Sequence, residues 1–181
     1  METEVEIRPV FELEDFGAAV TPELREQEER QRAVGREEVA RRTTMRFMIL
    51  VKANKDTEAG VMPEENLAAA MATYHEELVK SGVLLDASGL KPSSKGWRIR
   101  YSGGKRTVVD GPFTETKELI AGYTVIQVKS REEALEWAKR FPNPHGESDA
   151  EIEVRQLYEI EDFGPSEAME RFRDMGIGTK T

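Results

Sequence analysis

Residues Val108-Val109-Asp110-Gly111-Pro112-Phe113-Thr114-Glu115-Thr116-Lys117-Glu118 form the stretch that decides the fold. The β-branched pair before Asp110 is typical of a strand, and Gly-Pro is typical of a corner. Ahead of it, Ser102-Gly103-Gly104-Lys105 separates two strand-like runs, 97–101 and 106–110, which is a strong β-hairpin signal. The stretch therefore predicts a strand that returns from a hairpin and ends in a corner carrying the Asp110 carboxylate.

Strand and helix patterns alternate on both sides of this stretch. Strands are predicted over 46–53, 83–90, 119–129 and 151–164, helices over 63–80 and 130–141, a loop over 54–61 and a short C-terminal helix over 165–175. The two longer helices carry core stripes at helical spacing, made of Leu67, Met71, Tyr74 and Leu78 and of Ala134, Trp137, Ala138 and Phe141. Two strand–helix–strand crossovers in one sheet predict an α+β fold, a ferredoxin-like sandwich.

Both helices of such a sandwich cover the same face of the sheet. The other face needs a cover, and a second subunit is the common solution. We therefore expect a homodimer in which the two sheets pack face to face.

Composition excludes several classes of function. The chain of 181 residues has a net charge of −9, a pI near 5.0 and no cysteine. An acidic surface repels phosphate backbones, so no nucleic-acid partner is expected. Disulfides and thiolate chemistry are excluded, and no apolar run approaches the roughly 20 residues of a membrane span. We expect a soluble cytoplasmic protein with no membrane partner and no cofactor.

The N-terminal segment repeats the predicted last strand. Residues 4–17 (EVEIRPVFELEDFG) and 151–164 (EIEVRQLYEIEDFG) are identical at eight of fourteen positions, and only Pro9 against Gln156 differs in kind. Pro9 lacks an N–H, which favours a sheet edge for the first copy. We divide the chain into an extension, residues 1–44, and a domain, residues 45–181. The extension could add an edge strand to its own sheet or to a partner's, and its charged stretch 23–42 is either a solvated helix or linker, or a partner-binding helix.

His75 and Asp110 are the candidate catalytic residues. His75 lies on the shoulder of a predicted core stripe, where it could reach a partly buried pocket, and Asp110 could orient or charge-stabilise its imidazole. A His–Asp pair is the minimal kit for proton transfer or for activating a water. The alternatives are a structural helix histidine and an aspartate that caps its own turn.

Further residues are candidates for lining a pocket: Tyr74, Trp97, Phe113, Glu115 and Lys117. The aromatic side chains could instead fill the core, and the charged ones could form a solvated turn. His145 near Glu147, Asp149 and Glu151 suggests a metal site only weakly, because the ligand spacing is irregular, so no metal is predicted.

Several motifs in the right order resemble the DGPF branch of the YCII-related proteins. They are Asp110–Glu118, the opening Met45-Arg46-Phe47-Met48, Tyr74-His75-Glu76-Glu77-Leu78 and Ala121-Gly122-Tyr123. The resemblance covers about residues 45–164 and implies a dimeric α/β barrel. It also implies that residues 4–32 resemble the tail of one such domain placed ahead of a second.

The resemblance further implies a His–Asp pair, with His75 matching the helix histidine of the family and Asp110 matching the DGPF motif. The resulting hypothesis is a small-molecule enzyme that performs acid–base chemistry, namely isomerisation, elimination or hydrolytic removal of a substituent. Because members of the family are often encoded beside sigma factors, the alternative is a non-catalytic ligand-binding or regulatory module.

Overall fold

The structure, a computed structural model, describes residues 22, 25–26, 29–31, 44–114 and 118–179. The chain divides into two compact units, Met1–Thr43 and Thr44–Thr181. In the first unit the described residues are helical, and Arg30 pairs with Glu26 one turn earlier at 2.6 Å. The first copy of the repeat, residues 4–17, lies outside the described residues.

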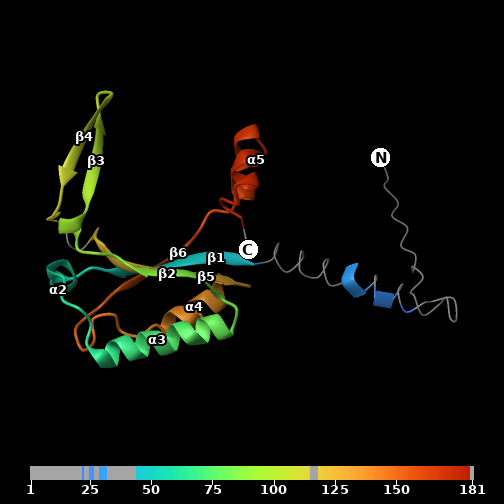
Figure 1. The fold of residues 1–181 in the computed structure, drawn as a ribbon, viewed down its shortest axis with the longest axis horizontal. Coiled ribbons are helices and arrows are strands. Elements are labelled where there is room, and N and C mark those ends of the chain that lie inside the picture. Colours follow the sequence, from blue (N-terminus) through green and yellow to red (C-terminus); the bar gives the residue numbers. More distant parts are fainter. Residues whose placement is uncertain (1–21, 23–24, 27–28, 32–43, 115–117, 180–181) are drawn as a thin grey trace, which may run out of the picture. The chain divides into compact units, whose positions relative to one another are not determined.

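The second unit is built on a four-stranded antiparallel sheet. Its strands are β1 (Met45–Lys52), β2 (Leu84–Gly89), β5 (Ile120–Val128) and β6 (Ile152–Gln156), in the order β2-β5-β1-β6. Helices α3 (Glu65–Lys80) and α4 (Arg131–Lys139) cover one face of this sheet (Figure 1). The α+β class is confirmed, and the strand order with two helical crossovers is the one expected of a ferredoxin-like sandwich.

The helix-covered side, which we call the closed face, holds the core. Its buried cluster comes from three sources, the sheet, α3 and α4: Phe47, Ile49, Ile126 and Val128; Tyr74 and Leu78; and Ala134 and Trp137. The predicted stripes of both helices are confirmed. Ser130 caps α4, since its side chain accepts from the Glu133 N–H at 3.2 Å. Full burial of a side chain such as Leu78 contributes about 1.5–3 kcal/mol to folding.

The predicted hairpin forms a sheet of its own. Strands β3 (Trp97–Ser102) and β4 (Lys105–Asp110) pair with each other and are joined by Gly103 and Gly104, at φ 55° and 74°. A two-residue turn with both φ positive matches the twist of a hairpin, and glycine adopts it without strain. The hairpin projects from the side of the main sheet opposite α3 and α4 (Figure 1).

We call this second side of the main sheet the open face. Opposed residues of an antiparallel pair share a face, so the pairs Met48–Val125 and Leu50–Tyr123 lie on it. Helix α5 (Glu167–Asp174) projects from the same side, away from the hairpin (Figure 1). The hairpin and α5 thus flank the open face.

Two short elements differ from the sequence predictions. Helix α2 (Lys55–Ala59) occupies part of the predicted loop, because Asn54 and Thr57 form a capping box and Gly60 ends the helix at φ 76°. The predicted strand 151–164 is too long. It ends at Gln156, and the short 3₁₀ helix η4 (Ile160–Phe163) follows it.

The predicted strand ends at Gln156 because a turn follows it. Asp162 accepts from the Glu159 N–H at 2.8 Å, and this contact closes the turn. Ile160 is buried within the turn while Tyr158 remains 74% exposed, so the two side chains do not share one strand face.

Strand β6 lies at the edge of the sheet, and its hydrogen bonds explain why a proline suits position 9 of the first repeat copy. The N–H of Leu157 donates to Arg46 at 2.8 Å and that of Lys52 donates to Glu151 at 3.2 Å. Bonded pairs alternate in an antiparallel ladder, so Gln156, opposite Phe47, has its N–H directed away from β1. Proline, which stands at the matching position of the first copy, is compatible with that place in an edge strand.

Candidate functional site

The imidazole of His75 is bound between α3 and the sheet. Its Nδ1 lies 2.8 Å from the Met71 carbonyl oxygen one turn earlier, and its Nε2 lies 3.0 Å from the Thr124 hydroxyl on β5. A carbonyl oxygen only accepts, so Nδ1 donates to Met71, and Nε2 shares a hydrogen bond with the Thr124 hydroxyl. Thr124 is 2% exposed. Both ring nitrogens therefore have partners inside the closed face.

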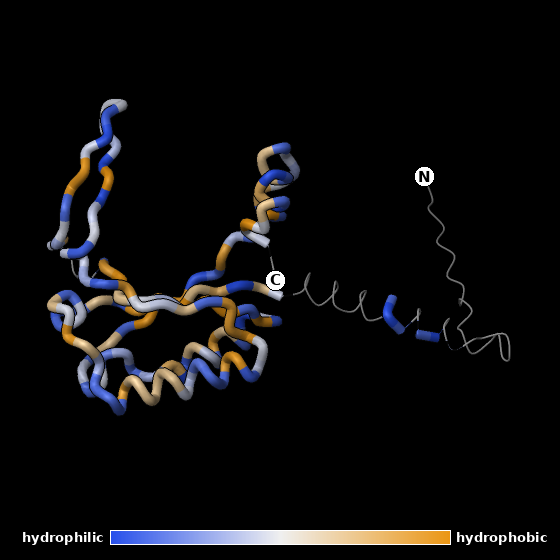
Figure 2. Tube along the Cα trace, in the orientation of Figure 1, coloured by the Kyte–Doolittle hydropathy of each residue, from blue (hydrophilic) through white to orange (hydrophobic). Residues whose placement is uncertain are grey.

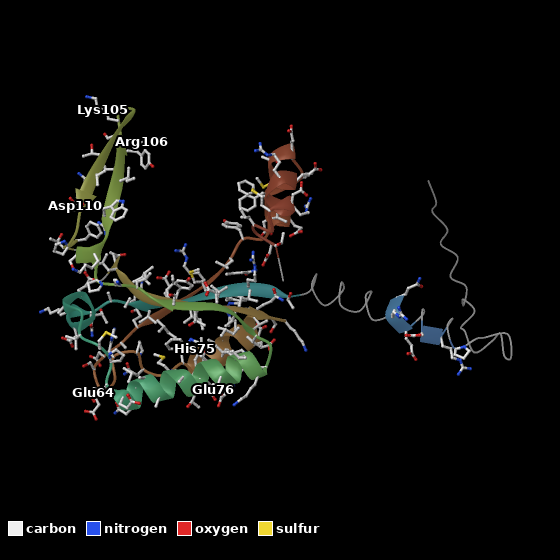
Figure 3. All side chains as sticks on the ribbon, viewed as in Figure 1. Glu64, His75, Glu76, Lys105, Arg106 and Asp110 are labelled. Atoms are coloured by element: carbon white, nitrogen blue, oxygen red, sulfur yellow. The ribbon has the colours of Figure 1, made fainter. Side chains whose placement is uncertain are left out.

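Asp110 lies on the other side of the sheet. It ends β4 opposite Trp97, at the foot of the hairpin, and its side chain is exposed. Figure 3 shows His75 on the helix side and Asp110 on the hairpin side of the main sheet. One chain does not bring the two side chains together.

The predicted pocket-lining residues fall in different places. Tyr74 is 4% exposed in the core, where its hydroxyl donates to the Trp137 carbonyl oxygen at 3.1 Å, and burial raises the pKa of Tyr74 to about 12. Trp97 is 66% exposed on the hairpin, and Phe113 lines a groove described below. Glu115 and Lys117 lie outside the described residues.

A groove of about 390 Å³ lies at the foot of the hairpin, and we call it the hairpin-foot groove. The residues that line it come from α2, from the segment between β2 and β3, and from the DGPF stretch and the start of β5. They are Glu58, Leu90, Lys91, Pro92, Ser93, Lys95, Gly96, Arg98, Phe113, Glu118, Leu119 and Ile120. Its volume falls within the range of about 300–1,000 Å³ that is usual for small-molecule sites.

Ser93 joins three of these segments. Its backbone N–H donates to both carboxylate oxygens of Glu58 at 3.1 and 3.2 Å, and its hydroxyl donates to the same carboxylate. The Ser93 hydroxyl oxygen in turn accepts from the Phe113 N–H at 3.1 Å. Glu58 on α2 therefore fixes the 3₁₀ helix η2 (Ser93–Lys95), and η2 fixes the aromatic residue of the DGPF stretch.

Gly111 packs so closely on η2 that it has no room for a side chain. Its N–H donates to Gly96 at 3.1 Å, and a Cβ added at Gly111 would meet the Ser93 carbonyl oxygen at 1.9 Å. The glycine of the DGPF stretch is thus required by close approach of two backbones. It brings Phe113 to the wall of the groove.

The rim of the groove is mainly cationic. Lys91, Lys95 and Arg98 are exposed and line it, against the carboxylates of Glu58 and Glu118. The Glu58 carboxylate is committed to Ser93, and the Arg98 guanidinium lies 3.9 Å from the centre of the Phe113 ring. Arg98 thus contributes to the wall of the groove through its contact with Phe113, and Lys91 and Lys95 supply exposed ammonium groups on the rim.

Sequence reasoning missed five of the polar groove residues, Glu58, Lys91, Ser93, Lys95 and Arg98. The available signal was the basic, turn-rich run Lys91-Pro92-Ser93-Ser94-Lys95-Gly96 directly before the hairpin. A run of this kind between two strands is typical of a functional loop on a rigid scaffold.

The weak metal hypothesis around His145 finds no geometric support. Its Nε2 contacts the Lys52 carbonyl oxygen at 3.0 Å, so His145 ties the loop after α4 to the end of β1. Over residues 44–114 and 118–179, no group of three or more His, Asp or Glu side chains could hold a metal ion. Among the helices that the structure describes, none is long and apolar enough to cross a membrane.

A comparison with protein families identifies the family of the chain. Residues 45–161 match the YCII-related domain. The chain belongs to this family. The chain is also similar to "Uncharacterized protein R00369" from Rhizobium meliloti (strain 1021), with 33% identity over 94 residues, which cover 52% of this chain and 75% of the relative. The family predicted from the DGPF stretch is confirmed, and the DGPF branch stays a prediction.

Proposed function

We propose that this YCII-related protein binds a small organic anion in the hairpin-foot groove. The observation that carries the proposal is the convergence of Lys91, Lys95 and Arg98 on an apolar-walled groove of about 390 Å³. Three cations and two carboxylates line the groove, and the Glu58 carboxylate is bonded to Ser93, so the groove carries a small excess of positive charge in a chain whose net charge is −9.

The walls favour a ligand with a flat apolar part. Phe113, Leu119 and Ile120 are partly buried groove residues, and the Phe113 ring is held by its backbone bond to Ser93. Sites for small molecules combine such apolar walls with a few placed polar groups. An aromatic carboxylate or phosphate meets both requirements, since its ring can pack on the apolar wall while its charge faces Lys91 and Lys95.

Calorimetric titration of the full chain tests this proposal. Benzoate and phenyl phosphate are the probes, and uncharged benzamide and benzyl alcohol are their controls. We expect saturable binding of at least one anion, about fivefold weaker in Lys95→Gln, because an ionic hydrogen bond of about 1 kcal/mol is lost. Lys129→Gln removes an exposed lysine outside the groove and should bind as the original does.

The proposal fails if neither anion binds, or if benzamide and benzyl alcohol bind equally well. It also fails if Lys95→Gln and Lys129→Gln behave alike, because the cation would then have no part in recognition.

Acid–base catalysis by His75 and Asp110 remains a separate prediction of the resemblance. Turnover of a bound anion by isomerisation, elimination or hydrolysis would have to fall in both His75→Asn and Asp110→Asn. A ligand that binds without turnover instead favours the non-catalytic binding or regulatory module.

We also infer that the protein is a homodimer that packs open face on open face, the dimeric α/β barrel that the resemblance implies. Met48, Leu50, Tyr123 and Val125 give the open face an apolar row, of which Met48 and Tyr123 are only partly buried in one chain, and α3 and α4 lie on the other side of the sheet. Light scattering of the full chain tests this inference: twice the chain mass supports it, and the mass of one chain contradicts it.

A further inference from the structure

One face of the hairpin carries cations and no acid. Side chains alternate along a strand and directly opposed residues share a face, so the strand register assigns each side chain of the hairpin to one of two faces. The face that we call the hairpin cationic face consists of three opposed pairs: Arg98 with Val109, Arg100 with Thr107, and Ser102 with Lys105. The other face holds Arg106 and Asp110 among apolar side chains and has no net charge.

The hairpin cationic face is the one that borders the hairpin-foot groove. Arg98 lines the groove, and its guanidinium carbon lies 3.9 Å from the centre of the Phe113 ring. Val109, opposite Arg98, is partly buried, whereas Val108 on the other face is 62% exposed. Figure 2 shows hydrophilic (blue) and hydrophobic (orange) residues interleaved along the hairpin. The surface of the groove therefore continues from Arg98 onto this face.

Arg100 is the next cation along the face. It follows Arg98 by two residues on β3, about 7 Å farther from the foot of the hairpin at the usual rise of a strand. Thr107 stands directly opposite on β4, and both side chains are exposed. A guanidinium and a hydroxyl group on adjacent strands supply several hydrogen-bond donors, which suits one carboxylate or phosphate group.

Arg100 does not line the groove, whereas Lys91 and Lys95 do. An anionic group held at the two lysines therefore leaves the Arg100 guanidinium unused. The apolar wall at Phe113 and the stem of Arg98 lie between the two places where an anion fits.

From this arrangement we propose that the groove and the hairpin cationic face together bind an elongated organic dianion. One anionic group faces Lys91 and Lys95, the flat apolar middle packs on the wall, and the second anionic group faces Arg100 and Thr107. The proposal rests on anion binding in the hairpin-foot groove and adds the class of ligand, a molecule with a carboxylate or phosphate at each end.

Calorimetric titration of the full chain with ligands matched in shape tests the second anionic group. Terephthalate and biphenyl-4,4′-dicarboxylate carry two carboxylates, and the monoamide of each keeps the shape with one charge. At least one dianion should bind about tenfold more tightly than its monoamide, of which about twofold is the statistical advantage of two equivalent ends. Arg100→Gln, first shown by circular dichroism to be folded, should lower this ratio of Kd values to about twofold.

Arg106→Gln is the matched control. It removes one cation from the same hairpin but from the opposite face, where the Arg106 guanidinium lies 5.4 Å from the centre of the Tyr101 ring. The ratio of Kd values should remain about tenfold in this variant.

The dianion proposal is overturned if neither dianion exceeds its monoamide by more than about twofold, and binding of benzoate would then leave anion binding in the groove standing. It is also overturned if Arg106→Gln lowers the ratio as much as Arg100→Gln, because the general charge of the hairpin would then explain the preference. If neither the dianions nor benzoate and phenyl phosphate bind, the groove and the dianion proposals fall together.

Discussion

The closed and open sides of the main sheet differ in how completely their polar groups and apolar surfaces are satisfied. On the closed face, Tyr74 bonds to Trp137 and His75 bonds to Met71 and Thr124, within a packed core. The mainly cationic rim of the groove lies at the foot of the hairpin, and exposed apolar side chains lie on the hairpin and in the C-terminal segment. A titratable residue near the core is therefore not the best guide to function in this molecule. The groove at the foot of the hairpin, which has exposed lysines on its rim, is the better candidate for binding.

The largest expected effect is on the stability of the closed face. Leu78 is fully buried on α3, so Leu78→Ala should lower the free energy of unfolding by about 2–5 kcal/mol through lost burial and a cavity. Ile99→Ala on the hairpin, at 45% exposure, should cost less than about 1 kcal/mol. Urea unfolding followed by circular dichroism measures both. Equal costs would contradict the distinction between a packed and an uncovered side.

Two proline variants in the edge strand β6 test which of its backbone N–H groups bond to β1. Arg155 faces Met48 in a bonded pair, so Arg155→Pro removes a ladder bond and should cost about 3 kcal/mol. Gln156 directs its N–H away from β1, so Gln156→Pro should cost less than about 1 kcal/mol. Thermal unfolding compares them, and the reverse order would show that the register is wrong.

Gly111 holds the corner of the DGPF stretch against η2 by close backbone contact. Gly111→Ala must push apart the DGPF corner and η2, and we expect a cost of about 1–3 kcal/mol with weaker anion binding. Gly89→Ala is the control, because a Cβ there meets nothing within 4 Å. Unfolding and calorimetric titration are measured on both variants. If Gly111→Ala binds the anion normally, the DGPF corner does not shape the groove.

The smallest expected effect is the contribution of Tyr74 to the pH dependence of folding stability. Burial raises the pKa of Tyr74 from 10.0 to about 12. The folded state then holds a proton that the unfolded state loses, so the Tyr74 contribution is present below pH 10 and is lost as the pH rises to about 12. Tyr74→Phe should flatten the fall in stability across this interval. A wild-type slope that Tyr74→Phe leaves unchanged would assign the effect to other groups.

The sequence was sufficient to predict the sheet, the two long helices and the hairpin, because their signals are local. Hydrophobic spacing placed Tyr74 and Leu78 in the core, and Gly103-Gly104 specified the turn. Helix α2 was predictable in principle from Asn54, Thr57 and Gly60, but a five-residue helix has little periodicity.

The site was less predictable because it depends on relations between elements. Helical spacing placed His75 on the shoulder of α3 but could not say on which side of the sheet the Asp110 hairpin would project. The groove combines α2, η2 and the DGPF stretch, segments that are distant in sequence and are joined by Ser93 and Glu58. Of the residues considered for a pocket, Phe113 lines the groove, whereas Tyr74 lies in the core with its hydroxyl bonded to Trp137.

One titration tests most directly whether the anion binds in the hairpin-foot groove. Benzoate or phenyl phosphate, whichever binds the original protein, is titrated calorimetrically into Lys95→Gln and His75→Gln, each first shown by circular dichroism to be folded. We predict about fivefold weaker binding for Lys95→Gln, and a Kd within about twofold of the original for His75→Gln, because His75 is bonded inside the closed face. Loss of binding in His75→Gln with normal binding in Lys95→Gln would contradict this account.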